Sequence, residues 1–262
     1  MARVRSVLTI AGSDSGGGAG IQADLKTFAA HGLHGLSAIA ALTAQNTRGV
    51  QAIHVPPPSF LKAQLNSVFT DFDVRAVKIG MLANARIIDT VADALEHYRP
   101  KCIVLDPVMV SSSGHTLLET RAIRRLVQRL LPLATVITPN IDEAMLLLGH
   151  GIDNEEQAEG ALVELLAMGA NAVLLKGGHL SGKKVIDRLD TGKALHEFEH
   201  PRLRISGHGT GCTLAAAIAA NLALKKSLQD ACEAAGDYVY AALKVAYTPG
   251  TKKLSVLKHV SA

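Results

Sequence analysis

Short apolar runs alternate with amphipathic segments along most of the chain. Runs rich in Val, Ile, Leu and Ala predict buried strands at residues 6–11, 37–42, 74–79, 102–105, 136–138 and 172–175. Helical patterns follow at 21–31, 59–72, 83–97, 117–131, 158–168, 213–225 and 228–247, with Ser59 as the expected N-cap of the second. This alternation predicts an α/β fold with a mainly parallel central sheet, helices on both faces and one domain spanning residues 1–262.

Polar or glycine-rich clusters follow most of the predicted strands. They occupy residues 12–20, 43–47, 106–109, 138–143 and 176–179, and residues 183–198 have the pattern of a polar hairpin. Ligands bind at the carboxyl ends of the strands in open parallel sheets. We therefore expect the five clusters to converge on one crevice that faces the glycine-rich segment 207–212.

The segment Gly207-His-Gly-Thr-Gly-Cys212 precedes an alanine-rich helix. A glycine turn that leads into a helix exposes unpaired N–H groups at the positive end of the helix dipole, which predicts an anion site. Cys212 lies at this helix N-terminus, where we expect the pKa of its thiol to be lowered. The alternative is a glycine-rich loop that caps a buried helix, with Cys212 as a small core residue.

The first glycine cluster, residues 12–20, lies between a strand and a helix. A P-loop would need Gly-Lys-Ser/Thr, and Gly17-Gly-Ala19 does not match it. A dinucleotide site would need a carboxylate about 20 residues later, and no Asp or Glu occurs between Leu25 and Thr70. We expect a loop that folds over a small ligand.

Five side chains in these clusters are candidates for chemistry. Asp106 follows a buried strand, a position typical of a metal or phosphate site. Asn140 and Glu143 lie three residues apart at a helix start, although Glu143 also suits a first-turn acid. Lys176 is either a phosphate ligand or a surface lysine, and Gln45 either pairs with the edge of a heterocycle or belongs to a polar turn. Together they match what phosphoryl transfer requires.

Composition narrows the class of protein further. The net charge is +4, but basic residues are scattered and aromatic residues make up only 3% of the chain, which argues against nucleic-acid binding. The three cysteines are widely spaced and form neither a disulfide framework nor a zinc motif. The N-terminus has no signal-peptide pattern, and the apolar stretch 211–224 is too short to span a bilayer. We expect a cytoplasmic protein without membrane partners.

Seven motifs in order resemble one family. They are AGSDSGGGAGIQAD (11–24), TAQNT (43–47), KIGML (78–82), LDPVMV (105–110), TPN (138–140), LKGG (175–178) and GTGCT (209–213). The chain resembles the hydroxymethylpyrimidine/phosphomethylpyrimidine kinases of thiamine biosynthesis, within the ribokinase superfamily. The resemblance implies a ribokinase-like fold and phosphorylation of 4-amino-5-hydroxymethyl-2-methylpyrimidine, and then of its monophosphate, with ATP and Mg²⁺.

The resemblance also implies roles for individual residues. An anion hole for the γ-phosphate is implied for Gly209, Thr210 and Gly211, and phosphate contact for Lys176. Cys212 stands where many ribokinase-like enzymes carry an aspartate base, and we expect its thiolate to take or relay the substrate hydroxyl proton. Magnesium is assigned to Asp106, Asn140 and Glu143. The pyrimidine is assigned to Gln45, with Gly12, Asp24, Met81 and Val108 lining its pocket.

The chain departs from the family pattern at two positions, Asp142 in place of Pro and Gly207 in place of Thr. We expect the second to loosen the anion loop. Pyridoxal kinase, from the same superfamily, is the main alternative function, and a non-catalytic relative that binds a small molecule is another. A homodimer is expected, as in many members of the superfamily, and the turn 111–115 is the candidate for closure over ATP.

Overall fold

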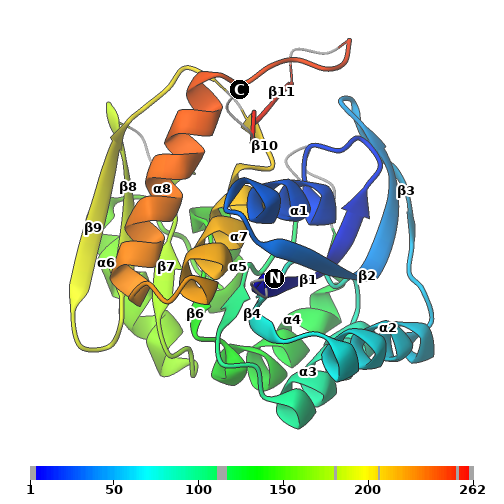
Figure 1. Ribbon diagram of the computed structural model, residues 1–262. Coiled ribbons are helices and arrows are strands. Elements are labelled where there is room, and N and C mark those ends of the chain that lie inside the picture. The colour runs from blue at the N-terminus through cyan, green and yellow to red at the C-terminus, as the bar shows by residue number, and fades with distance from the viewer. Residues whose placement is uncertain (1–3, 111–116, 180–181, 206, 252–253, 260–262) are drawn as a thin grey trace.

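The chain folds as the α/β architecture that its hydrophobic pattern predicts (Figure 1). The computed structural model describes residues 4–110, 117–179, 182–205, 207–251 and 254–259, so the turn 111–115 lies outside the described residues. The strands are β1 (Ser6–Asp14), β2 (His34–Asn46), β3 (Gly49–His54), β4 (Val74–Ile79), β5 (Ile103–Leu105), β6 (Val136–Ile137), β7 (Val173–Leu175), β8 (Lys184–Asp190), β9 (Leu195–Pro201), β10 (Gly207–His208) and β11 (Ser255–Val256).

Nine of these strands form one sheet within the described ranges, in the order β3-β2-β1-β4-β5-β6-β7-β8-β9. The six strands from β2 to β7 in that order run parallel. The strands β3, β8 and β9 add antiparallel edges, and β8 and β9 confirm the predicted hairpin. Strand β2 lies on one side of β1 and strand β4 on the other, so the direction in which strands are added reverses at β1. Such a switch point opens a crevice at the carboxyl ends of the strands.

Helices cover both faces of the sheet. They are α1 (Gly20–Ala30), α2 (Pro58–Asp71), α3 (Ala85–Tyr98), α4 (Thr120–Arg129), α5 (Ile141–Leu148), α6 (Glu155–Ala167), α7 (Thr210–Ala223) and α8 (Leu228–Lys244), with short 3₁₀ turns at Leu131–Leu133 and Gly177–His179. Successive strand residues point to opposite faces. Leu8 and Ile10 of β1 accordingly pack in the core with α2 to α6, whereas Val7 packs in the core with α1, α7 and α8.

Helix α7 lies in the middle of its layer, with α1 on one side and α8 on the other, and it packs against the sheet (Figure 1). Alanine fills much of it, and residues 214–220 are all buried. Small side chains let helix and sheet backbones approach closely, and alanine keeps a high helix propensity. The helix therefore reaches the carboxyl edge of the sheet with its N-terminus, which carries the predicted anion site.

The differences from the predicted elements fall at polar or exposed positions. Strand β3 has no pattern of buried residues because it is an edge strand, and sequence analysis missed it. The prediction that Ser59 caps α2 is wrong. The N-cap is Pro57, with no side-chain cap, and Pro58 begins the helix with a φ angle that already suits it.

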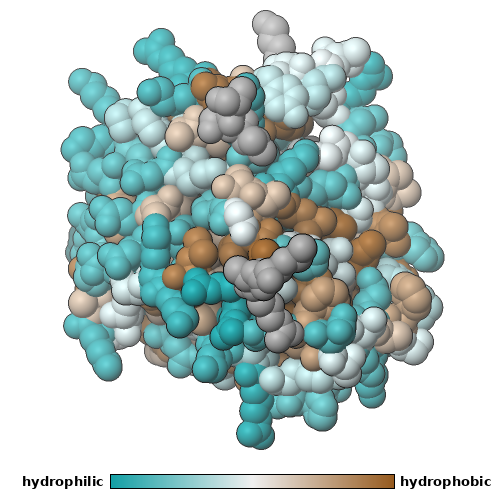
Figure 2. Space-filling model, in the orientation of Figure 1, coloured by the Kyte–Doolittle hydropathy of each residue, from teal (hydrophilic) through white to brown (hydrophobic). Residues whose placement is uncertain are grey.

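The surface is mostly hydrophilic on the face shown in Figure 2, with a band of hydrophobic side chains across its middle. In the part of the chain that the structure describes, no helix is both long enough and apolar enough to cross a membrane.

The C-terminal segment is held against α7 by a buried imidazole. The Thr213 hydroxyl donates to the Gly209 carbonyl at 2.8 Å and lies 3.0 Å from His259 Nε2, so it accepts from that nitrogen. The Tyr238 hydroxyl donates to the His259 carbonyl at 2.7 Å. Burial, with a smaller contribution from Lys26, lowers the pKa of His259 to about 4.

This burial predicts an acid-sensitive contribution to stability. His259 has a lower pKa when folded than its ordinary 6.5, so the unfolded chain binds more protons below pH 6.5. The free energy of unfolding is expected to fall by about 1 kcal/mol more in the wild type than in His259→Gln between pH 7 and pH 5. Urea unfolding at both pH values measures it, with exposed His97→Gln as the control. Equal pH dependence in His259→Gln and the wild type would contradict the assignment.

Candidate active site

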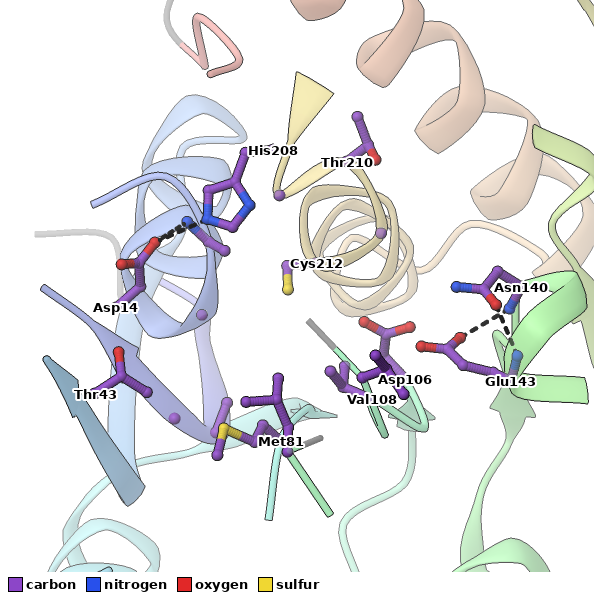
Figure 3. A pocket seen from close by; sticks show the side chains of 18 of the residues that line it. Asp14, Thr43, Met81, Asp106, Val108, Asn140, Glu143, His208, Thr210 and Cys212 are labelled. Carbon is purple, nitrogen blue, oxygen red and sulfur yellow. Dashed lines mark hydrogen bonds and ion pairs between the residues drawn. The ribbon is translucent and has the colours of Figure 1, made fainter. Parts of the chain in front are cut away.

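A cavity of about 500 Å³ opens at the carboxyl ends of β1, β2, β4 and β5, below the N-terminus of α7. Figure 3 shows Met81, Asp106 and Cys212 directed into the same space from different elements. The structure brings nearly all of the site residues predicted from the sequence to its lining, which includes Gly12, Gln45, Met81, Asp106, Val108, Asn140, Glu143, Lys176, Gly209, Thr210, Gly211 and Cys212. We call it the acceptor cavity.

The N-terminus of α7 is formed by a glycine that no other residue replaces easily. Gly209 is the N-cap, with φ 83° in the left-handed region, and no side chain caps the helix. A Cβ atom at Gly209 would lie only 2.0 Å from the carbonyl oxygen of Gly18 in the first glycine loop. The open N–H groups of the first turn therefore face the cavity, as an anion site requires.

Two carboxylates and a lysine form a buried cluster beside this helix end. Lys176 Nζ lies 2.9 Å from Asp106 Oδ1 and 3.5 Å from Glu143 Oε2. Burial opposes the charge on Lys176, but the two carboxylates outweigh it and raise the lysine pKa. Burial raises the pKa of Glu143 to about 7, against the effect of Lys176. The cluster thus holds a fixed cation next to the anion site.

Asn140 and Glu143 are held together by a reciprocal capping box at the start of α5. The Asn140 side chain accepts from the Glu143 N–H at 2.8 Å, and the Glu143 carboxylate accepts from the Asn140 N–H at 2.8 Å. The Asn-x-x-Glu spacing is a signature of this motif that sequence analysis did not use. The box turns the second oxygen of Glu143 toward Asp106 (Figure 3).

The donor set fits a magnesium ion that keeps much of its water. Mg²⁺ is usually bound through one or two carboxylates together with substrate phosphates. Asp106 and Glu143 supply two carboxylates within reach of Lys176 Nζ. Within the described ranges, no group of three or more His, Cys, Asp or Glu side chains is arranged to hold a metal without such partners. Asn140 already uses its amide oxygen in the capping box.

The expectation of a lowered pKa at Cys212 is wrong. Burial raises the pKa of this thiol to about 11; Lys78 lowers it, while Asp106 and Asp24 add to the increase. The helix N-terminus is visible in the sequence, but the depth of the side chain is not. Cys212 is therefore a thiol at neutral pH, and its sulfur points into the cavity (Figure 3).

Asp24 does not line the cavity, contrary to prediction. Its side chain is fully buried beneath the cavity floor, where Oδ2 lies 2.6 Å from Thr9 Oγ1 and 3.0 Å from Lys78 Nζ. Lys78 itself reaches the cavity lining, and Asp24 raises its pKa against the effect of burial. Sequence analysis assigned no role to Lys78, although a lysine inside an apolar strand is a signal of a buried partner.

The first glycine loop folds around the carboxylate of its own Asp14 and lines the acceptor cavity, and its predicted closure over a small ligand stays a prediction. Asp14 accepts N–H groups from Gly16 at 2.7 Å, Gly18 at 3.0 Å and Ala19 at 2.8 Å. His208 Nε2 lies 3.2 Å from Asp14 Oδ2 (Figure 3). Burial would raise the pKa of Asp14, but these hydrogen bonds together hold it below its ordinary value. Neither Asp14 nor His208 was predicted from the sequence as a site residue.

The departures from the family pattern leave the helix end intact. A Cβ at Gly207 would meet the terminal methyl groups of Leu243 and Leu257, so these side chains fill the space of the missing one. Asp142 is exposed and lies in the first turn of α5, where a negative charge is favourable.

A second cavity of about 300 Å³ lies on the other side of the α7 N-terminus. Its walls include Leu203, Ile205, Val239 and Leu243, with Asp187 among the polar residues. Asp187 accepts the Gly177 N–H at 2.9 Å. The two cavities share five lining residues, Asn140, Lys176, Gly207, Thr210 and Gly211. We call these five residues the junction.

Several named relatives of this chain are hydroxymethylpyrimidine/phosphomethylpyrimidine kinases. The hydroxymethylpyrimidine/phosphomethylpyrimidine kinase of Rhizobium meliloti is 48% identical over 241 residues, which cover 91% of this chain and 90% of that protein. A bifunctional thiamine biosynthesis protein of Geobacter sulfurreducens is 50% identical over 246 residues. That match spans 94% of this chain but only half of the length of the bifunctional relative.

Solved structures and family models agree on the fold. The ADP complex of Bacillus subtilis pyridoxal kinase superimposes with a TM-score of 0.92 at 34% identity, covering 98% of each chain. The phosphomethylpyrimidine kinase family model matches residues 14–257. With this match across nearly all of the sequence, and relatives of nearly 50% identity along most of their length, the chain belongs to the phosphomethylpyrimidine kinase family.

Proposed function

We propose that the chain phosphorylates 4-amino-5-hydroxymethyl-2-methylpyrimidine with ATP, and then phosphorylates the monophosphate to the diphosphate. The observation that carries this proposal is the junction, where two cavities of different character meet at one uncapped helix N-terminus. A transferring phosphoryl group needs donor and acceptor on opposite sides of a site that stabilises negative charge.

We assign the second cavity to the nucleotide. Its apolar walls suit a flat base, and it opens directly onto Lys176 and Gly211 at the junction. Lys176 carries a raised pKa and so stays charged, which suits contact with phosphate oxygens. Gly209, Thr210 and Gly211 present the N–H groups of the α7 turn to the γ-phosphate.

Magnesium is assigned to the carboxylates beside Lys176. Asp106 and Glu143 would hold the ion, in part through water, while Asn140 fixes Glu143 through the capping box. When bound, Mg²⁺ neutralises charge on the nucleotide phosphates. The carboxylates in turn hold the ammonium group of Lys176 in place at the junction.

The acceptor cavity is assigned to the pyrimidine. Met81 and Val108 offer apolar contact, and Gln45 can pair with the polar edge of the ring. Gly12 leaves room for the Met81 sulfur, which would lie 3.0 Å from a Cβ at that position. Cys212 lies at the junction side of this cavity, where we assign it to the substrate hydroxyl. Its thiol has to lose its own proton before it can accept another, because its pKa is about 11.

A pyridoxal kinase activity is the second candidate, because the pyridoxal kinase of Bacillus subtilis has nearly the same fold. The assignments to a homodimer and to the cytoplasm remain predictions of the sequence.

The proposed reaction is tested by mass-resolved analysis of products from ATP, Mg²⁺ and either ring compound. We expect the pyrimidine diphosphate to accumulate after the monophosphate. Pyridoxal phosphate as the sole product would support the second candidate. No product from either ring would contradict both and favour a non-catalytic relative.

Gly211→Ala tests the junction. A Cβ at this position would lie 3.1 Å from Lys176 Nζ, so it displaces the lysine and narrows the path between the cavities. We expect kcat/KM for the first phosphorylation to fall by about tenfold to hundredfold. Gly160→Ala is the control, since a Cβ at this helical glycine of α6 meets open space. Equal rates in the two variants would mean that the junction is not the path of transfer.

The pH dependence of turnover tests Cys212 as the base. If its thiolate takes the proton, the active fraction rises with pH toward a pKa of about 11. We expect wild-type kcat to increase between pH 7 and pH 9, and Cys212→Ala to lose about 10²-fold or more with a flat profile. Full activity in Cys212→Ser, or a flat wild-type profile, would exclude the thiolate as base.

A further inference from the structure

A single ring nitrogen faces two polar side chains at the rim of the acceptor cavity. His208 Nε2 lies 3.2 Å from Asp14 Oδ2 and 3.1 Å from the amide nitrogen of Gln45. All three side chains line the cavity, and the imidazole is only 12% exposed. Whether Nε2 carries a hydrogen or a lone pair therefore decides whether each neighbouring atom has to accept or donate a hydrogen bond.

The Asp14 side requires a hydrogen. This carboxylate accepts three backbone N–H groups of the glycine loop, and its pKa is held low, so it is an ion that only accepts. A lone pair on Nε2 would face a buried negative charge at 3.2 Å. An N–H on Nε2 instead supplies a charge-assisted hydrogen bond. The contact is favourable only with the hydrogen present.

The same hydrogen constrains Gln45. An amide NH₂ group only donates, so the Gln45 atom that faces an N–H on Nε2 has to be the amide oxygen. A half-turn of the side-chain amide exchanges the positions of its oxygen and its nitrogen. The exchange places the NH₂ group 3.1 Å from Thr43 Oγ1, where the amide oxygen stood. Thr43 Oγ1 can accept there, because its own hydrogen goes to the Ser13 carbonyl at 3.0 Å.

The resulting chain of hydrogen bonds runs in one direction. His208 shares its one Nε2 hydrogen between the Asp14 carboxylate and the Gln45 amide oxygen. Gln45 then donates to Thr43, and Thr43 donates to the Ser13 carbonyl. The opposite arrangement, in which Gln45 donates to His208, leaves the Asp14 carboxylate opposite a lone pair. A buried polar network with one unsatisfied member is costly, so the first direction is favoured.

We propose that His208 is a positioning residue whose Nε2–H fixes the orientation of the Gln45 amide, and thereby selects the donor and acceptor pattern of the ring. The proposal rests on the proposed function, in which Gln45 reads the pyrimidine edge. A 4-aminopyrimidine offers an accepting ring nitrogen beside a donating amino group. The 4-oxo analogue, with a hydrogen on the ring nitrogen, offers the reverse. A fixed amide matches one pattern and rejects the other.

Gly18 makes the arrangement possible. A Cβ on this residue would lie 2.7 Å from His208 Cδ2 and 2.8 Å from Val256 Cγ1. The bare backbone therefore lets the imidazole lie against the glycine loop, next to the carboxylate that the loop surrounds. The pairing of β10 with β11 holds the backbone of His208 beside Val256.

The decisive experiment compares the 4-amino substrate with its 4-oxo analogue in wild type, His208→Leu and His208→Gln. Both kcat/KM and calorimetric affinity are measured for each ring. We expect the wild type to prefer the amino ring by about 10²-fold, because mismatched polar groups stay unpaired. His208→Leu should lose at least tenfold of this preference, mainly through KM, because the amide is free to turn. His208→Gln should keep it, because its NH₂ group donates as Nε2–H does.

The second measurement uses the unaltered protein, so it does not depend on whether a variant folds. Long-range ¹H–¹⁵N spectra of protein labelled with ¹⁵N-histidine show whether Nε2 of His208 carries a hydrogen. An Nε2 without a hydrogen would overturn the proposal. An unchanged amino-to-oxo preference in His208→Leu would also overturn it, while the proposed function would stand. A wild type that phosphorylates neither ring would instead defeat the proposed function.

Discussion

The contact between two glycines determines how the site is built. A side chain at Gly209 would collide with the Gly18 carbonyl, and one at Gly18 would collide with His208 and Val256. The left-handed backbone of Gly209 begins α7 at this contact. This contact joins a loop near the start of the chain to a turn near its end. It leaves the first turn of α7 uncapped, brings His208 against Asp14 and aims Cys212 into the acceptor cavity.

Most charged side chains around this contact are paired, and the N-terminus of α7 is left as the position that favours an anion. Lys176 is compensated by two carboxylates, Lys78 by Asp24, and Asp14 by backbone N–H groups and His208. Among the residues that the structure describes, no side chain caps the N-terminus of α7. Negative charge that enters either cavity is therefore attracted to the same point, and burial strengthens this attraction.

The sequence was sufficient for the fold and for the lining of the site because both depend on local patterns. Buried strands and glycine turns are visible in short windows, and parallel strands necessarily gather their carboxyl ends. The burial of individual side chains was not predictable in the same way. The lowered thiol pKa expected at Cys212 and the place in the cavity lining expected for Asp24 were inferred from position along the chain. Both expectations were wrong, because the surroundings of each side chain are set by distant packing. Lys78 and His208 depend on partners outside any local window, whereas the capping box of Asn140 and Glu143 was available from spacing alone.

The pairing of Asp14 with His208 joins residues 194 positions apart, and this separation bears on how the protein acquires its site during synthesis. Contacts between distant residues form late, because the intervening chain has to be ordered first. A nascent chain that has emerged as far as β9 already contains the whole nine-stranded sheet and both carboxylates of the lysine cluster. It still lacks α7, and with it the anion site. Every strand of the sheet is therefore synthesised before the helix that completes the anion site.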